Sequence, residues 1–421
     1  MDQTTVRGAR SATLGAEQPL TRTAESDASR SGIIVHSHLR WDFVWQRPQQ
    51  IVSRLALHHP VLFLEEPQWR DQPVGLQVSE PHPNVVRVVP LMRQEDHRTV
   101  DAQCNALLGP LQRALASHPL LAGRFDQPVQ WFYSPMTAPS LLDQFGSAIV
   151  VYDCMDELAN FLFAPADIGQ REKLLLARAD LVFTGGRRLY ESKSRHHGNV
   201  HFFGCGVDFA HYAQARQSRT TIPAEVATLP RPVLGYFGVI DERIDYELLR
   251  HLAQAFRGAS IVMVGPVVKV NPESLPREVN VHWLGQRSYA ELPALVNSFD
   301  VCLMPFALNE ATQYINPTKT LEYMAAGKPV VSTAVPDVVS QYAPVVDVAD
   351  SHAAFAAAAQ RAVTAPRHDA LTAGIEQARK SSWESIVMQM RTHLLAAAEA
   401  RAATIESRRV CGALAQRAGA L

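Results

Sequence analysis

Short apolar runs separated by helix-like stretches recur along this chain, and the alternation limits the folds open to it. Within each run, polar and apolar residues do not alternate, which is typical of parallel strands covered by helices on both faces. The first series is GIIVHSH (32–38), VLFLEE (61–66), VQWFYSP (129–135), AIVVYDCM (148–155), LVFTGG (181–186) and VHFFGCG (200–206). Helix candidates such as PQQIVSRLALHH (48–59) lie between these runs.

A second series of the same kind follows, with expected helices over residues 245–256, 288–298 and 317–326. Its runs are PVLGYFGVI (232–240), SIVMVG (260–265), VNVHWLG (279–285), VCLMPFAL (301–308), PVVSTA (329–334) and VVDVAD (345–350). With 421 residues, the chain has room for two cores. We therefore expect two doubly wound α/β domains in series.

Composition shifts predict the domain boundaries. Residues 1–30 are polar and aperiodic, so we expect a disordered leader. The polar segment 214–229 is the expected linker between an N-terminal domain (31–213) and a C-terminal domain (230–380). A further helix is expected over 381–403, with a frayed tail over 404–421. Helical spacing is shown there by Trp383, Ile386, Val387, Met390 and Leu394.

Charge and cysteine usage narrow the function. The formal net charge of -1 argues against a nucleic-acid partner. Five scattered cysteines without a CxxC pair predict free thiols in a reducing cytoplasm and no zinc site. No apolar stretch approaches the ~20 residues that span a bilayer. The last helix and tail contain arginines that fit either a solvated face or peripheral contact with the inner face of the plasma membrane, namely Arg391, Arg401, Arg408 and Arg409.

The stretch NPTKTLEYMAAGKPVVST (316–333) has the signature of a ligand-binding helix. Asn316 is a suitable N-cap and Pro317 a suitable first residue, while Gly327 fits the helix end. The preceding apolar run makes this the carboxyl edge of a sheet, where ligands bind in open α/β folds. Free amides at the start of the helix form an anion site, to which Lys319 adds a full charge.

One turn after Lys319, Glu322 faces the same side and suits two vicinal sugar hydroxyls. A cation and a carboxylate together match a nucleoside diphosphate. Leu321 has the character of a packing residue. The alternative is a solvated Lys–Glu pair at i, i+3, worth only tenths of a kcal/mol.

The same stretch resembles the nucleotide-sugar clamp of retaining glycosyltransferases of the GT-B fold (family 4, group 1 type). The resemblance continues through GYFGVIDERIDYELL (235–249) and the helix that begins at SSWESIV (381–387). The stretch WDFVWQRPQ (41–49) is similar to that of a subgroup resembling teichuronic-acid biosynthesis enzymes. The resemblance implies two Rossmann-like domains facing a central cleft, with a C-terminal helix crossing back to the first domain.

One position departs from the family pattern. The first glutamate of the family's E-x7-E motif falls on Tyr314, whereas the second falls on Glu322. Glu310 is near but out of register. Either Glu310 substitutes for the missing carboxylate, or polar atoms of NEATQYIN (309–316) hold the sugar.

Donor binding is expected mainly in the C-terminal domain. In the resembling enzymes, a basic residue at the position of Arg243 joins the clamp lysine across the diphosphate, and arginine suits such forked contacts. The alternative is a loop arginine paired with a neighbouring acid such as Asp241. The expected donor-binding residues are Gly238, Arg243, Asn316, Lys319, Thr320, Leu321 and Glu322.

In the N-terminal domain, four residues are candidates for the acceptor side: His38, Trp41, Trp45 and Arg47. The alternative for either tryptophan is that it packs the loop. The alternative for a strand histidine is that it forms a hydrogen bond in the core.

The stretch VVYDCMDELANF (150–161) adds Asp153 and Asp156, either of which could orient the acceptor or act as a base. Asp156 also suits an N-cap. We take Asp153, Asp156 and Glu310 as the candidate catalytic residues.

These expectations favour a glycosyltransferase of hexosyltransferase type, working without a metal or cofactor. It would move a sugar from a UDP- or GDP-type donor to a glycan or lipid-linked acceptor in cell-envelope assembly. A nucleotide-sugar epimerase on the same fold is one alternative, and a catalytically inactive sugar-nucleotide or glycan-binding subunit is another. No GxGxxG follows any apolar run, which disfavours a dinucleotide-dependent oxidoreductase.

Overall fold

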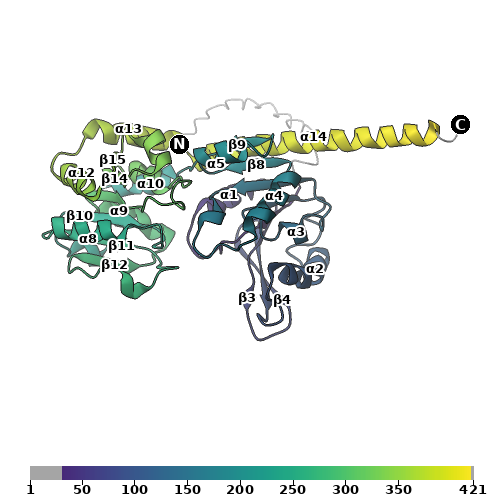
Figure 1. Ribbon diagram of the computed structural model, residues 1–421, viewed down its shortest axis with the longest axis horizontal. Helices are drawn as coiled ribbons and strands as arrows, with labels where there is room; N and C mark the ends of the chain where they lie inside the picture. Colours follow the sequence, from purple (N-terminus) through teal and green to yellow (C-terminus); the bar gives the residue numbers. More distant parts are fainter. Residues whose placement is uncertain (1–30, 419–421) are drawn as a thin grey trace, which may run out of the picture.

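A computed structural model describes residues 31–418, which form two α/β lobes side by side (Figure 1). The predicted leader, residues 1–30, lies outside the described residues. The N-terminal sheet has the order β3-β5-β2-β1-β6-β7-β8-β9, parallel throughout, with β4 antiparallel to β5 at the edge. Its strands are β1 (Ile33–His36), β2 (Val61–Leu64), β3 (Gln68–Trp69), β4 (Gly75–His82), β5 (Val85–Met92), β6 (Val129–Phe132), β7 (Ile149–Cys154), β8 (Leu181–Thr184) and β9 (Val200–Phe202).

Helices cover this sheet on both faces, as its buried central strands require. They are α1 (Arg47–Leu55), α2 (Val100–Ser117), α3 (Ala138–Leu141), α4 (Ile168–Arg178) and α5 (Arg187–Lys193). The strands β3 to β5 and the helix α2 were not among the predicted elements. Pro90 lies inside β5 and Pro110 inside α2. Proline usually argues against the interior of either element, and here the first is tolerated near a sheet edge.

The C-terminal sheet is parallel throughout, in the order β12-β11-β10-β13-β14-β15. Its strands are β10 (Val233–Phe237), β11 (Ser260–Val264), β12 (Val281–Gly285), β13 (Val301–Met304), β14 (Val330–Thr333) and β15 (Asp347–Ala349). The strand order reverses at β10 in this sheet and at β1 in the other. Ligands in such sheets bind outside the carboxyl ends of the strands at this reversal.

The helices of the C-terminal lobe are α8 (Tyr246–Ala255), α9 (Leu292–Ser298), α10 (Lys319–Ala325), α11 (Pro336–Tyr342), α12 (His352–Thr364) and α13 (His368–Lys380). The predicted linker contains no strand, only a 3₁₀ turn and the short helix α7 (Ala224–Ala227). Before it, α6 (Phe209–Ala213) contributes Tyr212 to the C-terminal core. The C-terminal core therefore recruits residues ahead of the predicted linker.

The last helix, α14 (Trp383–Ala418), leaves the C-terminal lobe and runs along the N-terminal lobe (Figure 1). Trp383, Val387, Met390 and Leu394 are buried against the N-terminal sheet, as their spacing predicts. Burial of each such side chain contributes about 1.5–3 kcal/mol. The predicted frayed tail is wrong as far as Ala418, because the alanine- and arginine-rich sequence propagates the helix. No described helix combines the length and apolar character needed to cross a bilayer.

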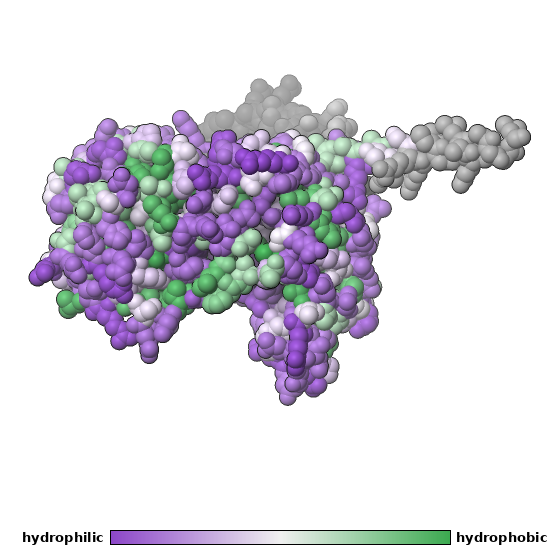
Figure 2. All heavy atoms as spheres, viewed as in Figure 1, coloured by the Kyte–Doolittle hydropathy of each residue, from purple (hydrophilic) through white to green (hydrophobic). Residues whose placement is uncertain are grey.

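The face shown in Figure 2 is mainly hydrophilic, with hydrophobic residues in several patches, one of them at the junction of the two lobes. Three cavities of the described residues lie at the carboxyl edges of the sheets. One of 710 Å³ belongs to the N-terminal lobe, whereas those of 560 and 110 Å³ are lined by both lobes. The interlobe cavities bring together residues that are far apart in the sequence.

Candidate functional site

Gly238 ends β10 at the point where the sheet order reverses. Its φ of +149° belongs to a region that residues with a side chain rarely adopt. A Cβ here would lie 2.5 Å from the Tyr236 hydroxyl oxygen and 3.2 Å from Lys319 Cε. Glycine thus lets the backbone approach Lys319 closely.

Lys319 and Glu322 lie on the first turn of α10, with Lys319 Nζ 3.2 Å from Glu322 Oε2. The side chains are only 15% and 9% exposed, so this is not the solvated surface pair of the alternative interpretation. Lys319 Nζ also donates to Thr318 Oγ1 at 3.1 Å and lies 5.1 Å from the centre of the Phe237 ring. The ammonium group is therefore fixed at the wall of both interlobe cavities.

The start of α10 differs from the prediction. Thr318 is the N-cap, and its carbonyl accepts the first helical bond from the Glu322 amide at 3.2 Å. Asn316 and Pro317 precede the helix, because the Pro317 carbonyl takes only a three-residue turn bond from Thr320. The prediction of Asn316 as N-cap and Pro317 as first helical residue is wrong.

Thr320 and Leu321 do not reach the cavities. Both are fully buried, and the Thr320 hydroxyl donates to Met304 Sδ at 3.5 Å. Leu321 belongs to the C-terminal core, as its apolar character predicts. The structure thus gives no support to side-chain contacts between these two residues and a donor.

Asn316 has an unusual side chain among the described residues. It is 9% exposed, and neither its amide oxygen nor its amide nitrogen has a hydrogen-bond partner. The side chain lines the 110 Å³ interlobe cavity, together with Arg243 and Lys319. Buried amides are normally paired, so this group is available for a ligand in the cavity.

Arg243 lines the same cavity but is already paired. Its Nη2 lies 2.7 Å from Asp241 Oδ2, and its Nε donates to Asp241 Oδ1 at 3.0 Å. The alternative interpretation, a loop arginine paired with a neighbouring acid, therefore holds in this structure. The guanidinium group nevertheless lies at the cavity wall with Lys319, where an anion could compete with Asp241.

Asp156 is the carboxylate that the N-terminal lobe places at this cavity. Withdrawal from water raises its pKa from 3.8 to about 6, and the positive charges of Arg243 and Arg47 partly oppose that shift. The next residue, Glu157, is held by Lys193 Nζ at 2.8 Å, which fixes the loop. Glu157 rather than Asp156 precedes the following 3₁₀ turn, so the alternative of Asp156 as an N-cap is wrong.

Asp153 and Arg47 form a buried ion pair. Arg47 Nη2 lies 2.9 Å from Asp153 Oδ1, and the side chains are 3% and 0% exposed. Arg47 Nη1 also donates to the Phe203 carbonyl at 2.8 Å, and its side chain reaches the 110 Å³ cavity. Asp153 is too buried to contact an acceptor, because it ends a strand inside the sheet. Of the two candidate carboxylates, Asp153 is therefore not the one placed to orient the acceptor or act as a base.

His36 and His38 lie at the largest of these cavities, at the carboxyl end of β1. His36 stacks on Phe132 at 4.1 Å and contacts Gln130 at 3.1 Å, and burial lowers its pKa to about 3. It is the core histidine of the alternative interpretation. Burial also lowers the pKa of His38 to about 4, so His38 presents a neutral imidazole to the cavity.

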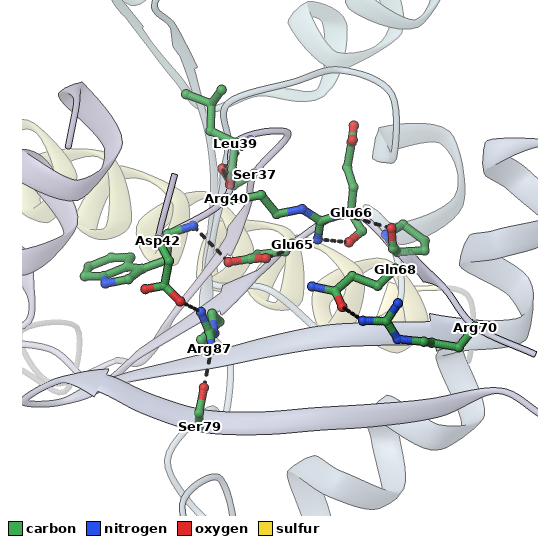
Figure 3. A network of polar contacts seen from close by, with 12 residues as sticks. Ser37, Leu39, Arg40, Asp42, Glu65, Glu66, Gln68, Arg70, Ser79 and Arg87 are labelled. Carbon is green, nitrogen blue, oxygen red and sulfur yellow. Dashed lines mark hydrogen bonds and ion pairs between the residues drawn. The ribbon is translucent and has the colours of Figure 1, made fainter. Parts of the chain in front are cut away.

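Polar contacts fix the segment that follows β1 (Figure 3). Arg40 Nη1 lies 3.1 Å from Glu65 Oε2, and the amide of Trp41 donates to Glu65 Oε1 at 2.9 Å. Arg87 pairs with Asp42. These contacts anchor the start of the loop formed by residues 41–45.

Trp41 and Trp45 differ from each other in burial, although both lie at the 560 Å³ cavity. Trp41 is buried against Phe63, with ring centres 5.2 Å apart, which matches the packing alternative. Trp45 lines the 560 Å³ cavity together with Lys319 and Glu322. The loop therefore lies on the expected donor side, rather than on the acceptor side. Its length from the end of β1 carries it across to the other lobe.

Glu310 and Tyr314 do not reach the interlobe cavities either. Glu310 is exposed and lines none of the cavities described above. Tyr314 packs against a hydrophobic cluster of the N-terminal lobe that includes Phe132 and Leu189. A tyrosine at this position thus joins the lobes instead of supplying a carboxylate, and the nearby Asn316 amide remains at the cavity.

Sequence reasoning missed Tyr289 and the loop before it. Residues 286–289 line the 560 Å³ cavity just after β12. The available signal was positional, because this loop follows the carboxyl end of a strand in a parallel sheet. No motif distinguishes these residues.

Residues 231–365 match the family described as glycosyl transferases group 1. The match covers the C-terminal lobe, including Gly238, Arg243, Lys319 and Glu322. It extends over about a third of the chain.

One curated relative is a Bacillus subtilis (strain 168) protein named "Putative teichuronic acid biosynthesis glycosyltransferase TuaH". It is 27% identical over 224 residues, which are 49% of this chain and 55% of the relative. The chain thus matches about half the length of this relative.

Solved structures share the fold over most of the chain. A UDP-forming α,α-trehalose-phosphate synthase from Burkholderia vietnamiensis superposes with a TM-score of 0.64 at 14% identity, covering 88% of this chain and 99% of that one. An Escherichia coli structure titled as trehalose-6-phosphate bound with UDP-2-fluoro glucose gives a TM-score of 0.61 at 13% identity, covering 86% and 99%. The chain has the GT-B architecture. The predicted fold class, two Rossmann-like domains with a returning C-terminal helix, is confirmed.

Proposed function

We propose that the chain is a glycosyltransferase that moves a sugar from a nucleoside diphosphate to a hydroxyl acceptor. One observation carries the proposal: Gly238, Arg243 and Lys319 of one lobe and Asp156 of the other line a single cavity. Two cations and a carboxylate at an interlobe cavity suit a diphosphate leaving group opposite a hydroxyl nucleophile. The family match and the fold are consistent with this chemistry.

The donor would lie mainly against the C-terminal lobe. Lys319 and Arg243 would stabilise the negative charge that grows on the departing diphosphate, as preorganised cations do in phosphate chemistry. The Glu322 carboxylate would accept hydrogen bonds from the ribose hydroxyls. A UDP-type sugar is favoured over a GDP-type sugar by the UDP-2-fluoro glucose in the Escherichia coli structure. The resemblance implies no metal or cofactor, and that expectation stays a prediction.

The acceptor would bind against the N-terminal lobe, with its reacting hydroxyl near Asp156 and the rest of the molecule toward the 710 Å³ cavity, where His38 lines the wall. A neutral imidazole can both donate and accept a hydrogen bond to a sugar hydroxyl. Retention of configuration rests on the family resemblance. A role in polysaccharide assembly rests on the name of TuaH and the same resemblance. A place at the inner face of the plasma membrane rests on the arginines of the last helix and tail.

In the reaction, the acceptor oxygen forms a bond to the anomeric carbon, and the bond from that carbon to the diphosphate breaks. The acceptor proton leaves to the diphosphate or to Asp156. Closure of the lobes around both substrates would exclude water and limit hydrolysis of the donor.

A nucleotide-sugar-binding subunit without turnover is the second candidate. It is favoured by the ion pair that already occupies Arg243, and by Tyr314 and Glu310, neither of which supplies a carboxylate to the cavity. In such a subunit the nucleotide would bind, but no sugar would be released.

A two-stage experiment separates these candidates. A thermal-shift screen with UDP, GDP and ADP identifies the nucleotide, because a ligand that binds only the folded state raises the melting temperature. Release of the free nucleotide from its sugar conjugates, with and without glycan acceptors, then measures turnover. Binding with acceptor-stimulated release supports the transferase, and binding without any release supports the binding subunit. No shift with any of the three nucleotides contradicts both.

A further inference from the structure

The 560 Å³ cavity has walls from both lobes. It shares Gly238 and Lys319 with the 110 Å³ cavity, so the two are neighbours along one cleft. The N-terminal lobe supplies residues 41–45, and the C-terminal lobe supplies residues 286–289 and Glu322. A ligand held by Lys319 and Glu322 can therefore extend into space that is bounded by residues 41–45 of the N-terminal lobe.

An aromatic pair forms part of this wall. The rings of Trp45 and Tyr289 lie 5.7 Å apart at an interplanar angle of 35°. These values fall within the range of favourable aromatic contacts. Since Trp45 belongs to one lobe and Tyr289 to the other, the pair exists only while the lobes are close together.

Tyr289 is held in place by its surroundings. Gln50 Nε2 of the N-terminal lobe donates to its hydroxyl oxygen at 3.1 Å. His211 stacks on its ring at 4.1 Å, and His211 Nε2 lies 2.9 Å from its carbonyl oxygen. The ring is thus a preorganised surface rather than a freely rotating side chain.

The opposite partner is also supported. Trp45 lies edge-on to Trp41, with ring centres 5.7 Å apart, and Trp41 is buried in the N-terminal core. Gln286 of the other lobe donates to the Phe43 carbonyl, which ties the two loops together. Packing of the lobe interface alone would explain the buried Trp41. It does not require the half-buried Trp45 to line a cavity shared with Lys319 and Glu322.

We propose that the nucleobase of the donor packs against Trp45 and Tyr289, so that the N-terminal lobe completes the nucleotide site. This inference rests on the proposed function, which assigns the diphosphate to Lys319 and the ribose to Glu322. The remaining part of such a donor is a flat aromatic ring, and stacking on aromatic side chains is worth about 1–3 kcal/mol per base. Donor binding then draws the lobes together, because each lobe supplies one wall of the donor site.

The test compares ligands with and without a base. Titration calorimetry on the full chain measures the Kd of UDP, GDP and inorganic pyrophosphate in the wild type, Trp45→Ala and Trp45→Phe. We expect Trp45→Ala to weaken the binding of whichever nucleoside diphosphate the wild type prefers by about 5- to 100-fold. Pyrophosphate, which has no base, should keep its affinity, and Trp45→Phe should recover most of the nucleotide affinity. Phe163→Ala is the matched control, because Phe163 is an aromatic residue of the same lobe that is 80% exposed.

Two calorimetric results overturn the inference in distinguishable ways. Unchanged nucleotide affinity in a folded Trp45→Ala variant contradicts the base site and leaves the proposed transferase standing. A wild type that binds no nucleoside diphosphate contradicts the proposed function, and the base site with it. If Trp45→Ala fails to fold, Trp45→Leu keeps the interface apolar without offering an aromatic face. Quenching of tryptophan fluorescence by the nucleotide should be smaller in Trp45→Phe than in the wild type, and equal quenching in both contradicts the base site.

Discussion

Arg47 and Asp153 form an ion pair almost wholly withdrawn from solvent, although 106 positions separate them in the sequence. The pair joins the first residue of α1 to the end of β7. It thereby fixes the floor of the interlobe cavity just before the chain reaches Asp156. Its role in the structure is to position the loop that contains Asp156.

Removing one partner of this pair should strongly destabilise the protein. Asp153→Ala leaves the Arg47 guanidinium buried without its counter-charge, which typically costs about 3–5 kcal/mol. The double variant Arg47→Met/Asp153→Leu removes both charges and should recover most of that loss. Urea denaturation of the three proteins measures the effect. A double variant that is as unstable as Asp153→Ala contradicts this explanation.

Gly238 should tolerate no side chain. Gly238→Ala adds a Cβ at a φ of +149°, within 2.5 Å of the Tyr236 hydroxyl and 3.2 Å of Lys319 Cε. We expect a loss of about 1–3 kcal/mol in the free energy of unfolding and weaker nucleotide binding, because Lys319 must move. Gly258→Ala is the control, since Gly258 is exposed and a Cβ there meets nothing within 4 Å. Equal stability and equal binding in the two variants would argue against this close approach.

Asp156 should make stability and activity depend on pH. Its pKa rises from 3.8 to about 6 on folding, so the folded state binds more protons than the unfolded state between these values. Stability therefore falls as pH increases through that window, and the loss persists above it. Asp156→Asn should remove this slope and melt at a higher temperature than the wild type near neutral pH. If the melting temperatures of the wild type and of Asp156→Asn change in parallel from about pH 4 to about pH 7, the raised pKa of Asp156 is contradicted.

If Asp156 accepts the proton of the acceptor, kcat/KM should fall on the acid side with an apparent pKa near 6, the value for the free protein. Asp156→Asn should abolish this limb of the pH profile along with most of the activity. If Asp156→Asn is still active and its kcat/KM falls at acid pH as in the wild type, another group accepts the proton.

Asn316 should matter for the sugar and little for the fold. Its amide has no partner in the structure, so Asn316→Ala breaks no hydrogen bond, and we expect a change in stability within about 1 kcal/mol. Affinity for the nucleotide sugar should fall, while affinity for the free nucleoside diphosphate stays near that of the wild type. Calorimetry with both ligands measures the difference. Equal losses for both would place Asn316 at the diphosphate instead.

The sequence predicts the two parallel sheets well, because strands buried on both faces leave unbroken apolar runs such as those of β10 and β11. The sequence predicts strands and helix ends less well where the usual preference of a single residue, such as proline or asparagine, disagrees with the pattern around it. Pro90 obscured β5, and the good capping residue Asn316 suggested a helix start that the turn at Pro317 does not allow.

The site was predictable where it depends on spacing along one helix and not where it depends on contact between lobes. Lys319 and Glu322 lie one turn apart, so their convergence follows from helical geometry. The partners of Asp153 and Trp45 come from distant segments of the chain. No local sequence pattern predicts which side of the cleft a loop will reach. Tyr289 was missed for the same reason.

Lys319 tests the central claim most directly, because it lines both interlobe cavities. Titration calorimetry should compare nucleoside diphosphate binding in the wild type, Lys319→Ala and Lys380→Ala, an exposed control on α13. We expect Lys319→Ala to remain folded, to weaken the binding of UDP or GDP, and to lower kcat/KM for the sugar donor by about 10²- to 10³-fold. Lys380→Ala should match the wild type. A folded Lys319→Ala variant with the affinity and turnover of the wild type would contradict the account.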